Sequence, residues 1–266
     1  VTGVQTCALP ISYISFILLV VVSFSSCKKE EDTTEPLRDV GEQYVADDLA
    51  INTYLNSHTY NYADFESDST LSLEDIKIDT LAGDNVGMKS LKELSTSKTI
   101  KVPLNDGTVV DHKLYYLEVR EGLGEQPSKA DSTYVTYKGE LLNGRVFDQR
   151  IAPIWMDLTG VIRGFREGMP YFKTGTYTVN EDNTVDFSGF GMGIIFLPSG
   201  IGYFSQANGS IPAYSPLIFK IGLYTYKITD HDGDGIPSSL EYDPDEDGVL
   251  NDTDGDGTPD YADKDS

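Results

Sequence analysis

The sequence predicts a mixed α+β fold with a largely antiparallel sheet for the middle of this 266-residue chain. Extended runs rich in β-branched and aromatic residues recur from residue 113 onward. Asn143-Gly144 stands between two of these runs, and this dipeptide is typical of a tight hairpin turn between antiparallel strands. One short helical stretch, 164–169, stops at Pro170, because proline cannot continue a helix. Several strands around one short helix indicate an α+β domain.

The beginning of the chain consists of processing segments. Residues 1–11 resemble the in-frame translation of a sequencing-library adaptor, and we leave them out of the reasoning. Residues 12–26 form a short apolar run, which predicts a secretion signal peptide. The run ends in Phe24-Ser25-Ser26-Cys27, which resembles a bacterial lipobox. That resemblance implies acylation of Cys27, a membrane anchor through lipid, and a polar linker over residues 27–39. An ordinary signal peptide with an incidental cysteine is the alternative.

Residues 40–112 are expected to form a helical and extended segment without chemistry of its own. Val40, Tyr44, Ile51 and Leu55 recur at three- to four-residue multiples, which predicts an amphipathic helix of about four turns. Such a helix must bury its apolar stripe. We expect it to pack against the following domain, and a dimer interface or a substrate-binding arm are the alternatives.

The domain predicted over residues 113–229 contains a series of strands. The expected elements are strands at 114–119, 134–137 and 217–224, a hairpin turn at 143–144, and the helix at 164–169. An insertion between Gly175 and Met192 contains a turn-forming stretch at 180–183, which predicts the tip of another hairpin.

Three sequence blocks in this domain carry a family resemblance. They are V-T-Y-K-G-E-L-L-N-G-R-V-F-D at 135–148, G-V-I-R-G-F-R-E-G-M at 160–169, and L-P-S-G-I-G-Y-F with S-I-P-A-Y-S-P-L-I-F-K-I at 197–204 and 210–221. In this order, they resemble an FKBP-type peptidyl-prolyl cis-trans isomerase. The resemblance implies an antiparallel sheet wrapped around the short helix, with a shallow aromatic pocket between them.

The same resemblance implies the residues of the pocket. Phe165 would form the floor, the Ile162 N–H would donate to a substrate carbonyl, and the Tyr203 hydroxyl would donate to a carbonyl near the proline. The family usually has Trp at the floor, and its tyrosine-glycine turn is absent before Ile211. The implied site residues are Tyr137, Phe147, Asp148, Val161, Ile162, Phe165, Tyr203, Ile211 and Phe219.

The chemistry of X-Pro isomerisation suits such a pocket. Rotation about the bond has a barrier of about 20 kcal/mol, because amide resonance must be broken. An apolar wall that excludes water favours the twisted amide, and fixed donors hold the carbonyl in place. No covalent bond changes, so we expect no cofactor for catalysis, and proline-containing polypeptides as partners. Two other functions remain open: a non-catalytic peptide-binding chaperone, and a calcium-dependent structural or adhesion lipoprotein of the cell surface.

The tail, residues 230–266, carries a repeated acidic pattern. Its first stretch, Asp230 to Glu241, fits a twelve-residue calcium loop with glycine at the sixth position. The repetition resembles thrombospondin type 3 repeats, which implies bound Ca²⁺, and a solvated acidic tail is the alternative. The expected calcium ligands are Asp230, Asp232, Asp234, Glu241, Asp243, Asp245, Asp247, Asp252, Asp254, Asp256, Asp260 and Asp263.

The charge balance limits the possible partners and the location. The net charge is −23, with 43 acidic against 20 basic residues. We therefore expect no nucleic-acid partner, because phosphate binding needs clustered Lys and Arg. Together with the lipobox, the tail predicts a lipoprotein of the cell envelope, held at the outer membrane and facing the periplasm or the cell surface.

Overall fold

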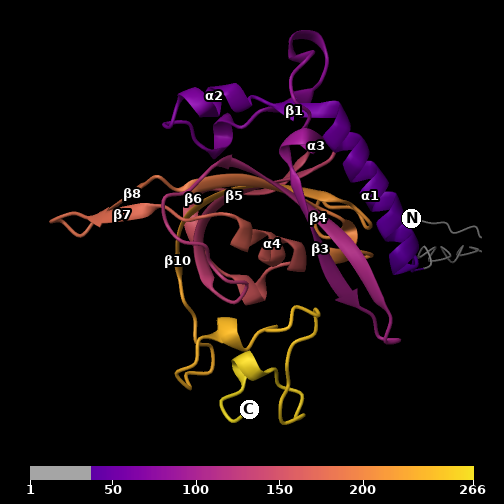
Figure 1. The fold of residues 1–266 in the computed structure, drawn as a ribbon, viewed down its shortest axis with the longest axis vertical. Helices are drawn as coiled ribbons and strands as arrows, with labels where there is room; N and C mark the ends of the chain where they lie inside the picture. Colours follow the sequence, from indigo (N-terminus) through magenta and orange to yellow (C-terminus); the bar gives the residue numbers. More distant parts are fainter. Residues whose placement is uncertain (1–36) are drawn as a thin grey trace, which may run out of the picture. The chain divides into compact units, whose positions relative to one another are not determined.

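A six-stranded sheet forms the centre of the computed structural model, which describes residues 37–266 (Figure 1). The adaptor-like segment, the predicted signal peptide and Cys27 lie outside the described residues. Leu37–Ser266 forms one unit by its internal contacts. Among the helices of this range, none is long and apolar enough to cross a membrane.

Every pair of neighbouring strands in the sheet is antiparallel, which confirms the predicted α+β class. The strand order is β3-β4-β9-β10-β5-β6. The strands are β3 (Thr96–Pro103), β4 (Val109–Arg120), β5 (Ser132–Leu141), β6 (Val146–Asp157), β9 (Gly191–Leu197) and β10 (Leu217–Lys227). The sheet thus begins at Thr96, and the boundary that we predicted between residues 112 and 113 falls within β4.

One face of the sheet curves around the short helix (Figure 1). Helix α4 (Arg163–Gly168) ends before Pro170, as predicted, and is followed by the 3-10 turn η4 (Met169–Tyr171). Phe165 and Met169 are buried in the core on this face, together with Phe172. Gly193 of β9 permits this packing, because a Cβ there would collide with the Phe172 ring. The helix therefore lies close to the sheet.

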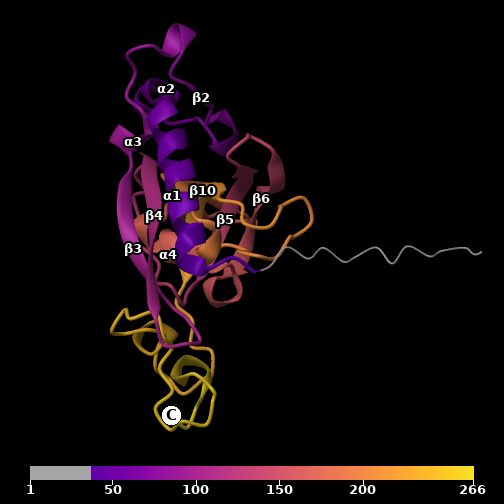
Figure 2. The same cartoon turned by 90° about the vertical axis from the view of Figure 1, so that its right-hand side faces the viewer.

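The segment before β3 covers the other face of the sheet. Its elements are α1 (Val40–Ser57), β1 (His58–Tyr60), α2 (Tyr62–Ser67), η1 (Leu73–Asp75), β2 (Ile78–Thr80), η2 (Gly83–Asn85) and α3 (Leu91–Leu94). The predicted helix is present, it is capped by the Asp39 side chain, and it lies along the sheet (Figure 2). Ile51 and Leu55 join a second core cluster with residues of β4, β9 and β10. The helix therefore packs against the following domain, as we expected.

The buried stripe of α1 differs from the predicted one in its first two turns. Gln43 and Asp47 are buried there, whereas Val40 and Tyr44 are only partly buried. A polar stripe is unusual, because a buried polar group must find a hydrogen-bond partner. Asp47 is 2% exposed, so the partners of its hydrogen bonds determine where this part of α1 lies on the domain.

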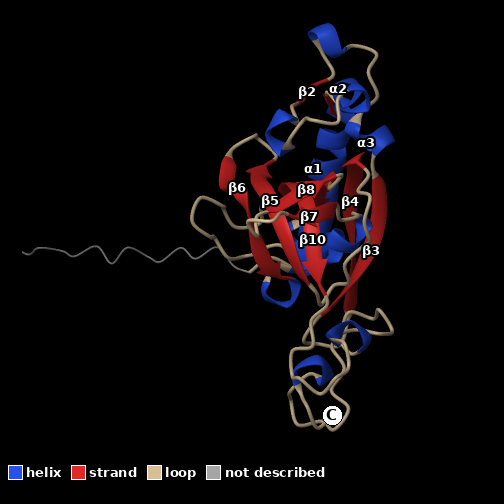
Figure 3. Cartoon of the chain, turned by 90° about the vertical axis from the view of Figure 1, so that its left-hand side faces the viewer, coloured by secondary structure: helices blue, strands red, loops and turns tan. Residues whose placement is uncertain are grey.

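The insertion and the tail extend from the sheet. Strands β7 (Thr176–Val179) and β8 (Val185–Ser188) form a separate two-stranded ribbon, with Asn183 at φ 64° in the predicted tip. The tail is mostly loop, with two short turns, η6 (Ser238–Leu240) and η7 (Asp260–Ala262) (Figure 3). Tyr242 of the tail lies beneath the Arg166 guanidinium of α4, 5.1 Å from it. The tail therefore contacts the helix that the sheet encloses.

Candidate functional site

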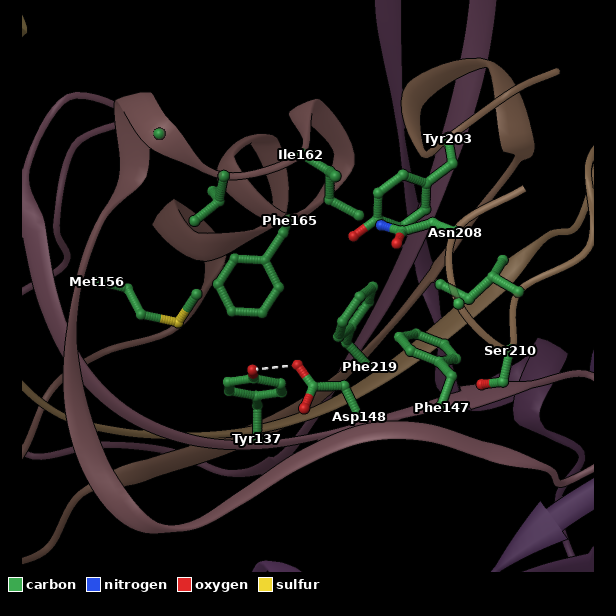
Figure 4. A pocket seen from close by; sticks show the side chains of 14 residues that line it. Tyr137, Phe147, Asp148, Met156, Ile162, Phe165, Tyr203, Asn208, Ser210 and Phe219 are labelled. Carbon is green, nitrogen blue, oxygen red and sulfur yellow. Dashed lines mark hydrogen bonds between the residues drawn. The ribbon is translucent and has the colours of Figure 1, made fainter. Parts of the chain in front are cut away.

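A cavity of about 540 Å³ opens between α4, the sheet, the turn that precedes α4 and the loop that follows β9 (Figure 4). All nine site residues implied by the resemblance line it. They come from β5, β6, the start of α4, the loop after η5 (Ser199–Ile201), and β10. The full lining is Tyr137, Phe147, Asp148, Met156, Gly160, Val161, Ile162, Phe165, Tyr203, Asn208, Gly209, Ser210, Ile211 and Phe219.

Aromatic rings form the base of the cavity. The Phe165 and Phe219 ring centroids are 5.2 Å apart and nearly perpendicular, and Phe147 meets Phe219 in the same edge-on way at 5.5 Å. Tyr137 meets Phe165 edge-on at 6.1 Å. Edge-to-face contacts are favourable because the positive ring edge meets the negative ring face. These contacts hold the rings as a rigid apolar surface.

Tyr137 and Asp148 form the polar corner of this surface. Both lie on paired strands, and the Tyr137 hydroxyl donates to Asp148 Oδ2 at 2.5 Å (Figure 4). Burial raises the pKa of Tyr137 to about 12, and the hydrogen bond to Asp148 adds to the shift. The phenol is therefore a neutral donor at any ordinary pH. Glycine at position 139 of β5 leaves room for the Phe147 ring, since a Cβ there would collide with it.

The wall next to α4 is set by two turns. The Asp157 side chain accepts from the Thr159 N–H at 2.9 Å and thereby caps the 3-10 turn η3 (Leu158–Gly160). Val161 and Ile162 follow, and the Ile162 carbonyl accepts from the amides of Phe165 and Arg166. This arrangement begins α4 at Arg163 and places Ile162 at the cavity, with Phe165 one turn below it.

The opposite wall is the segment from Tyr203 to Ile211. The Asn208 and Ile211 backbones pair in an isolated bridge, which brings Gly209 and Ser210 to the rim. Sequence reasoning missed Asn208, Gly209 and Ser210, because this loop departs from the family pattern. Met156 of β6 also lines the cavity, whereas its neighbour Trp155 is 53% exposed, as the alternation along a strand requires.

A second group of functional candidates lies in the tail. In each of three triads, one carboxylate oxygen per residue lies within 4.8 Å of the other two. The triads are Asp230, Asp232 and Asp234; Asp243, Asp245 and Asp247; and Asp252, Asp254 and Asp256. The glycine after each triad has a positive φ: 101° at Gly235, 87° at Gly248 and 100° at Gly257. The left-handed backbone conformation that glycine allows is therefore present at this position in all three loops.

The three other predicted ligands lie beside these triads. Partial burial raises the pKa of Glu241, and the carboxylates of the first triad add to the shift. Asp260 accepts from the N–H and the hydroxyl of Thr253, so its oxygens already have partners. Asp263 is 9% exposed, and its Oδ2 is buried without a hydrogen-bond partner among the described residues.

Comparison with known proteins shows which family part of the cavity-forming sequence resembles. Residues 124–179 match the family described as FKBP-type peptidyl-prolyl cis-trans isomerase. A probable FKBP-type peptidyl-prolyl cis-trans isomerase FkpA from Neisseria meningitidis is 29% identical over 156 residues, which are 57% of this chain and 49% of that protein. FkpA from Escherichia coli K12 is 32% identical over 117 residues, which are 43% of this chain and 38% of that protein. Over this region the chain is similar to FKBP-type peptidyl-prolyl cis-trans isomerases, and we refer to residues 113–229 as the FKBP-type domain.

The similarity covers about half of this chain. The crystal structure of FkpA from Escherichia coli matches 48% of this chain and 51% of that chain, with 30% identity and a TM-score of 0.36. The aligned part is less than half of either relative named above. Within the FKBP-type domain, the family match includes the site residues from Tyr137 to Phe165, whereas Tyr203, Ile211 and Phe219 follow it in the sequence. The fold brings both groups to the same cavity.

Proposed function

We propose that the FKBP-type domain catalyses cis–trans isomerisation of the peptide bonds that precede proline, in polypeptides outside the cytoplasm. One observation carries this proposal. Residues from three separate sequence blocks surround a single aromatic cavity of about 540 Å³. A cavity of this size and composition is typical of a site that encloses a small apolar group such as a proline ring.

The cavity offers the two features that the rotation needs. Phe165 and Phe219 are 2% and 5% exposed and present an apolar surface, which removes water from the amide and favours its twisted form. At the rim, the Ile162 N–H and the Tyr203 hydroxyl are proposed to donate to the carbonyls on either side of the proline. Binding energy at the rim then holds the bond in the geometry from which it rotates.

The proposal is tested by following the isomerisation of a short X-Pro peptide by NMR exchange with the full chain. The uncatalysed relaxation takes tens of seconds or longer, and we expect it to shorten in proportion to the protein concentration. Tyr203→Phe should lower kcat/KM, whereas Tyr177→Phe, on the exposed ribbon strand β7, should not. If the peptide binds in the cavity and the relaxation time is unchanged, the alternative of a non-catalytic peptide-binding chaperone replaces the enzyme.

We propose as a second function that the tail binds calcium. Carboxylate oxygens are the ligands that Ca²⁺ prefers, and three convergent triads provide them. A further observation indicates that these residues suit Ca²⁺. Asp232 Oδ2, Glu241 Oε2 and Asp263 Oδ2 are buried oxygens without a hydrogen-bond partner among the described residues. Such oxygens are costly unless a cation or a donor satisfies them.

Calorimetric titration of the full chain with calcium chloride tests this second function. We expect heat of binding in the wild type and a reduced number of sites in Asp232→Asn. Asp182→Asn, which removes an acid from the turn of the ribbon, is the matched control and should bind as the wild type does. If millimolar calcium produces no heat of binding, the tail is a solvated acidic segment and the proposed calcium sites are wrong. Calcium binding without isomerase activity would instead favour the structural or adhesion lipoprotein.

We also propose that the mature protein is anchored in the cell envelope through an acylated Cys27. The support is the lipobox-like sequence, since several acyl chains give stable anchoring where one does not. Cys27→Ser should move the protein from the membrane fraction to the soluble fraction. Retention in the membrane pellet would contradict lipidation, and the leaflet is then tested by protease access to intact cells.

A further inference from the structure

Asp47 is a buried carboxylate on α1 whose hydrogen bonds reach a distant part of the chain. Its Oδ2 accepts from the Ser199 N–H at 2.7 Å and from the Ser199 hydroxyl at 2.6 Å, and its Oδ1 accepts from Gln43 Nε2 at 2.7 Å. Asp47 is 2% exposed and Ser199 is fully buried. The helix before the FKBP-type domain therefore holds the first residue of η5, which lies 152 positions later in the sequence.

Ser199 in turn holds the backbone on both sides of Tyr203. Its carbonyl accepts from the Gly202 N–H at 2.8 Å and from the Phe204 N–H at 2.9 Å. The three residues from Gly202 to Phe204 are thus tied to one carbonyl. Because the N–H and the hydroxyl of Ser199 are both fixed by Asp47, a loss of Asp47 would free the residue on which the Tyr203 backbone depends.

A second contact, from a residue just before α1, reaches the same loop. The Arg38 N–H donates to the Tyr214 hydroxyl at 3.1 Å, and the Arg38 guanidinium lies 4.2 Å from the Tyr214 ring centre. The Tyr214 N–H donates to the Phe204 carbonyl at 2.6 Å, and the two rings meet edge-on. Contacts from the segment before the domain therefore bracket the Tyr203 wall of the cavity at two points.

The chemistry of Asp47 favours a positioning role over simple packing. Burial raises the pKa of its carboxyl above the ordinary value, while the hydrogen bonds from Ser199 and Gln43 oppose the shift. An apolar residue would pack the helix against the sheet without the free-energy cost of burying a carboxylate. Ile51 and Leu55 do so further along the same stripe. A carboxylate at this position instead supplies directional acceptors, which fix the orientation of a loop as well as its distance.

We propose that Asp47 is a positioning residue for isomerisation, acting through Ser199 to hold the Tyr203 hydroxyl at the rim of the cavity. This inference rests on the proposed isomerase function, and it adds a residue from outside the FKBP-type domain to the machinery of the site. Asp47 touches no substrate. It determines where a donor to the substrate lies, and a displacement of about 1 Å at such a donor is sufficient to lower the rate considerably.

Amide hydrogen exchange of the full chain tests the structural step independently of any activity. In Asp47→Ala, exchange at the Gly202 and Phe204 amides should accelerate by about tenfold or more, because their acceptor is no longer fixed. Asp48→Ala is the matched control, since Asp48 is the next residue of α1 and accepts from the Tyr115 hydroxyl at 2.9 Å on the sheet. It should leave those two amides unchanged. Equal exchange in Asp47→Ala and the wild type would overturn the proposal.

A double-mutant cycle tests the catalytic step. Asp47→Ala should lower kcat/KM by about threefold to tenfold in the wild type and by less than about twofold in Tyr203→Phe, because residues that act through one group are not additive. If Asp47→Ala does not fold, Asp47→Asn and Ser199→Ala replace it in the cycle, because each of them removes fewer hydrogen bonds. Additive losses would overturn the positioning role. An inactive wild type would refute the proposed function instead, and the same cycle on the dissociation constant of a proline peptide would then decide for or against positioning.

Discussion

Removal of the Tyr137 hydroxyl tests the polar corner of the cavity. Tyr137→Phe keeps the ring, which is 7% exposed, and deletes a hydrogen bond of 2.5 Å to Asp148. A hydrogen bond to a charged group contributes about 1.5–3 kcal/mol when both partners are buried. The Asp148 side chain is 47% exposed, so water replaces the lost donor, and we expect the free energy of unfolding to fall by only about 1 kcal/mol.

The effect on catalysis should exceed the effect on stability. Without the Tyr137 donor, Asp148 Oδ2 loses its partner. Only Oδ1 is still held, by the Gln149 N–H and the Arg150 guanidinium, so we expect kcat/KM to fall by about threefold to tenfold. Urea unfolding and the NMR exchange assay measure the two effects. Tyr134→Phe is the matched control, because Tyr134 lies on the same strand and its ring packs on Trp155 and Phe187 outside the cavity. Full activity in Tyr137→Phe, or an equal loss in Tyr134→Phe, would refute this reasoning.

The pH dependence provides a second measurement of the same group. An ordinary tyrosine with a pKa of about 10 would be roughly three-quarters ionised at pH 10.5. Burial and the Asp148 hydrogen bond raise the pKa of Tyr137 to about 12, so its neutral form persists beyond that pH. We therefore expect kcat/KM to change by less than about twofold between pH 7 and about 10.5. A decline centred near pH 10 that disappears in Tyr137→Phe would show that the hydroxyl is not shielded.

Three further substitutions probe the cavity and the tail. Phe147→Ala should lower kcat/KM by about tenfold at a cost of about 1–2 kcal/mol in stability, because the ring is only partly buried. Gly139→Ala should lower kcat/KM as well, because its Cβ displaces the Phe147 ring without removing it, and the exchange assay shows whether it does. Gly248→Ala should loosen the tail, since a Cβ there meets the Lys101 carbonyl and Arg163, and faster proteolysis within 243–256 would reveal it. Wild-type behaviour in any of the three would contradict the packing described for that residue.

Much of the fold followed from local sequence patterns. The hairpin at 143–144, the helix before Pro170 and the ribbon tip at 180–183 are set by turn chemistry, and the structure contains all three. Strand β9 was not predicted, although it lies at the centre of the sheet. Its seven residues are all buried, so it lacks the alternation by which a half-exposed strand is recognised, and its two glycines weaken the signal further.

The sequence allowed us to predict residues that surround the cavity, but not the hydrogen bonds that hold those residues in place. The family resemblance implies which side chains face a substrate, and all nine line the cavity, whereas their roles toward a substrate stay predictions. The bonds of Asp47 to Ser199 depend on a contact between segments 152 residues apart, which no local periodicity encodes. The apolar stripe of α1 was misassigned in its first two turns for the same reason. Gln43 and Asp47 are buried because they have hydrogen-bond partners inside the protein, whereas their residue types are mostly exposed in proteins.

Residues outside the FKBP-type domain support two walls of the cavity. Asp157, which caps the turn before Val161, also pairs with His231 of the tail at 2.9 Å. Arg163, directly after Ile162, donates to the Lys101 carbonyl at 2.6 Å and to the Gly248 carbonyl at 3.4 Å. The wall that carries Ile162 therefore rests on β3 and on the tail. An isolated domain would lack both the tail and α1, so the assays above require the chain that includes them.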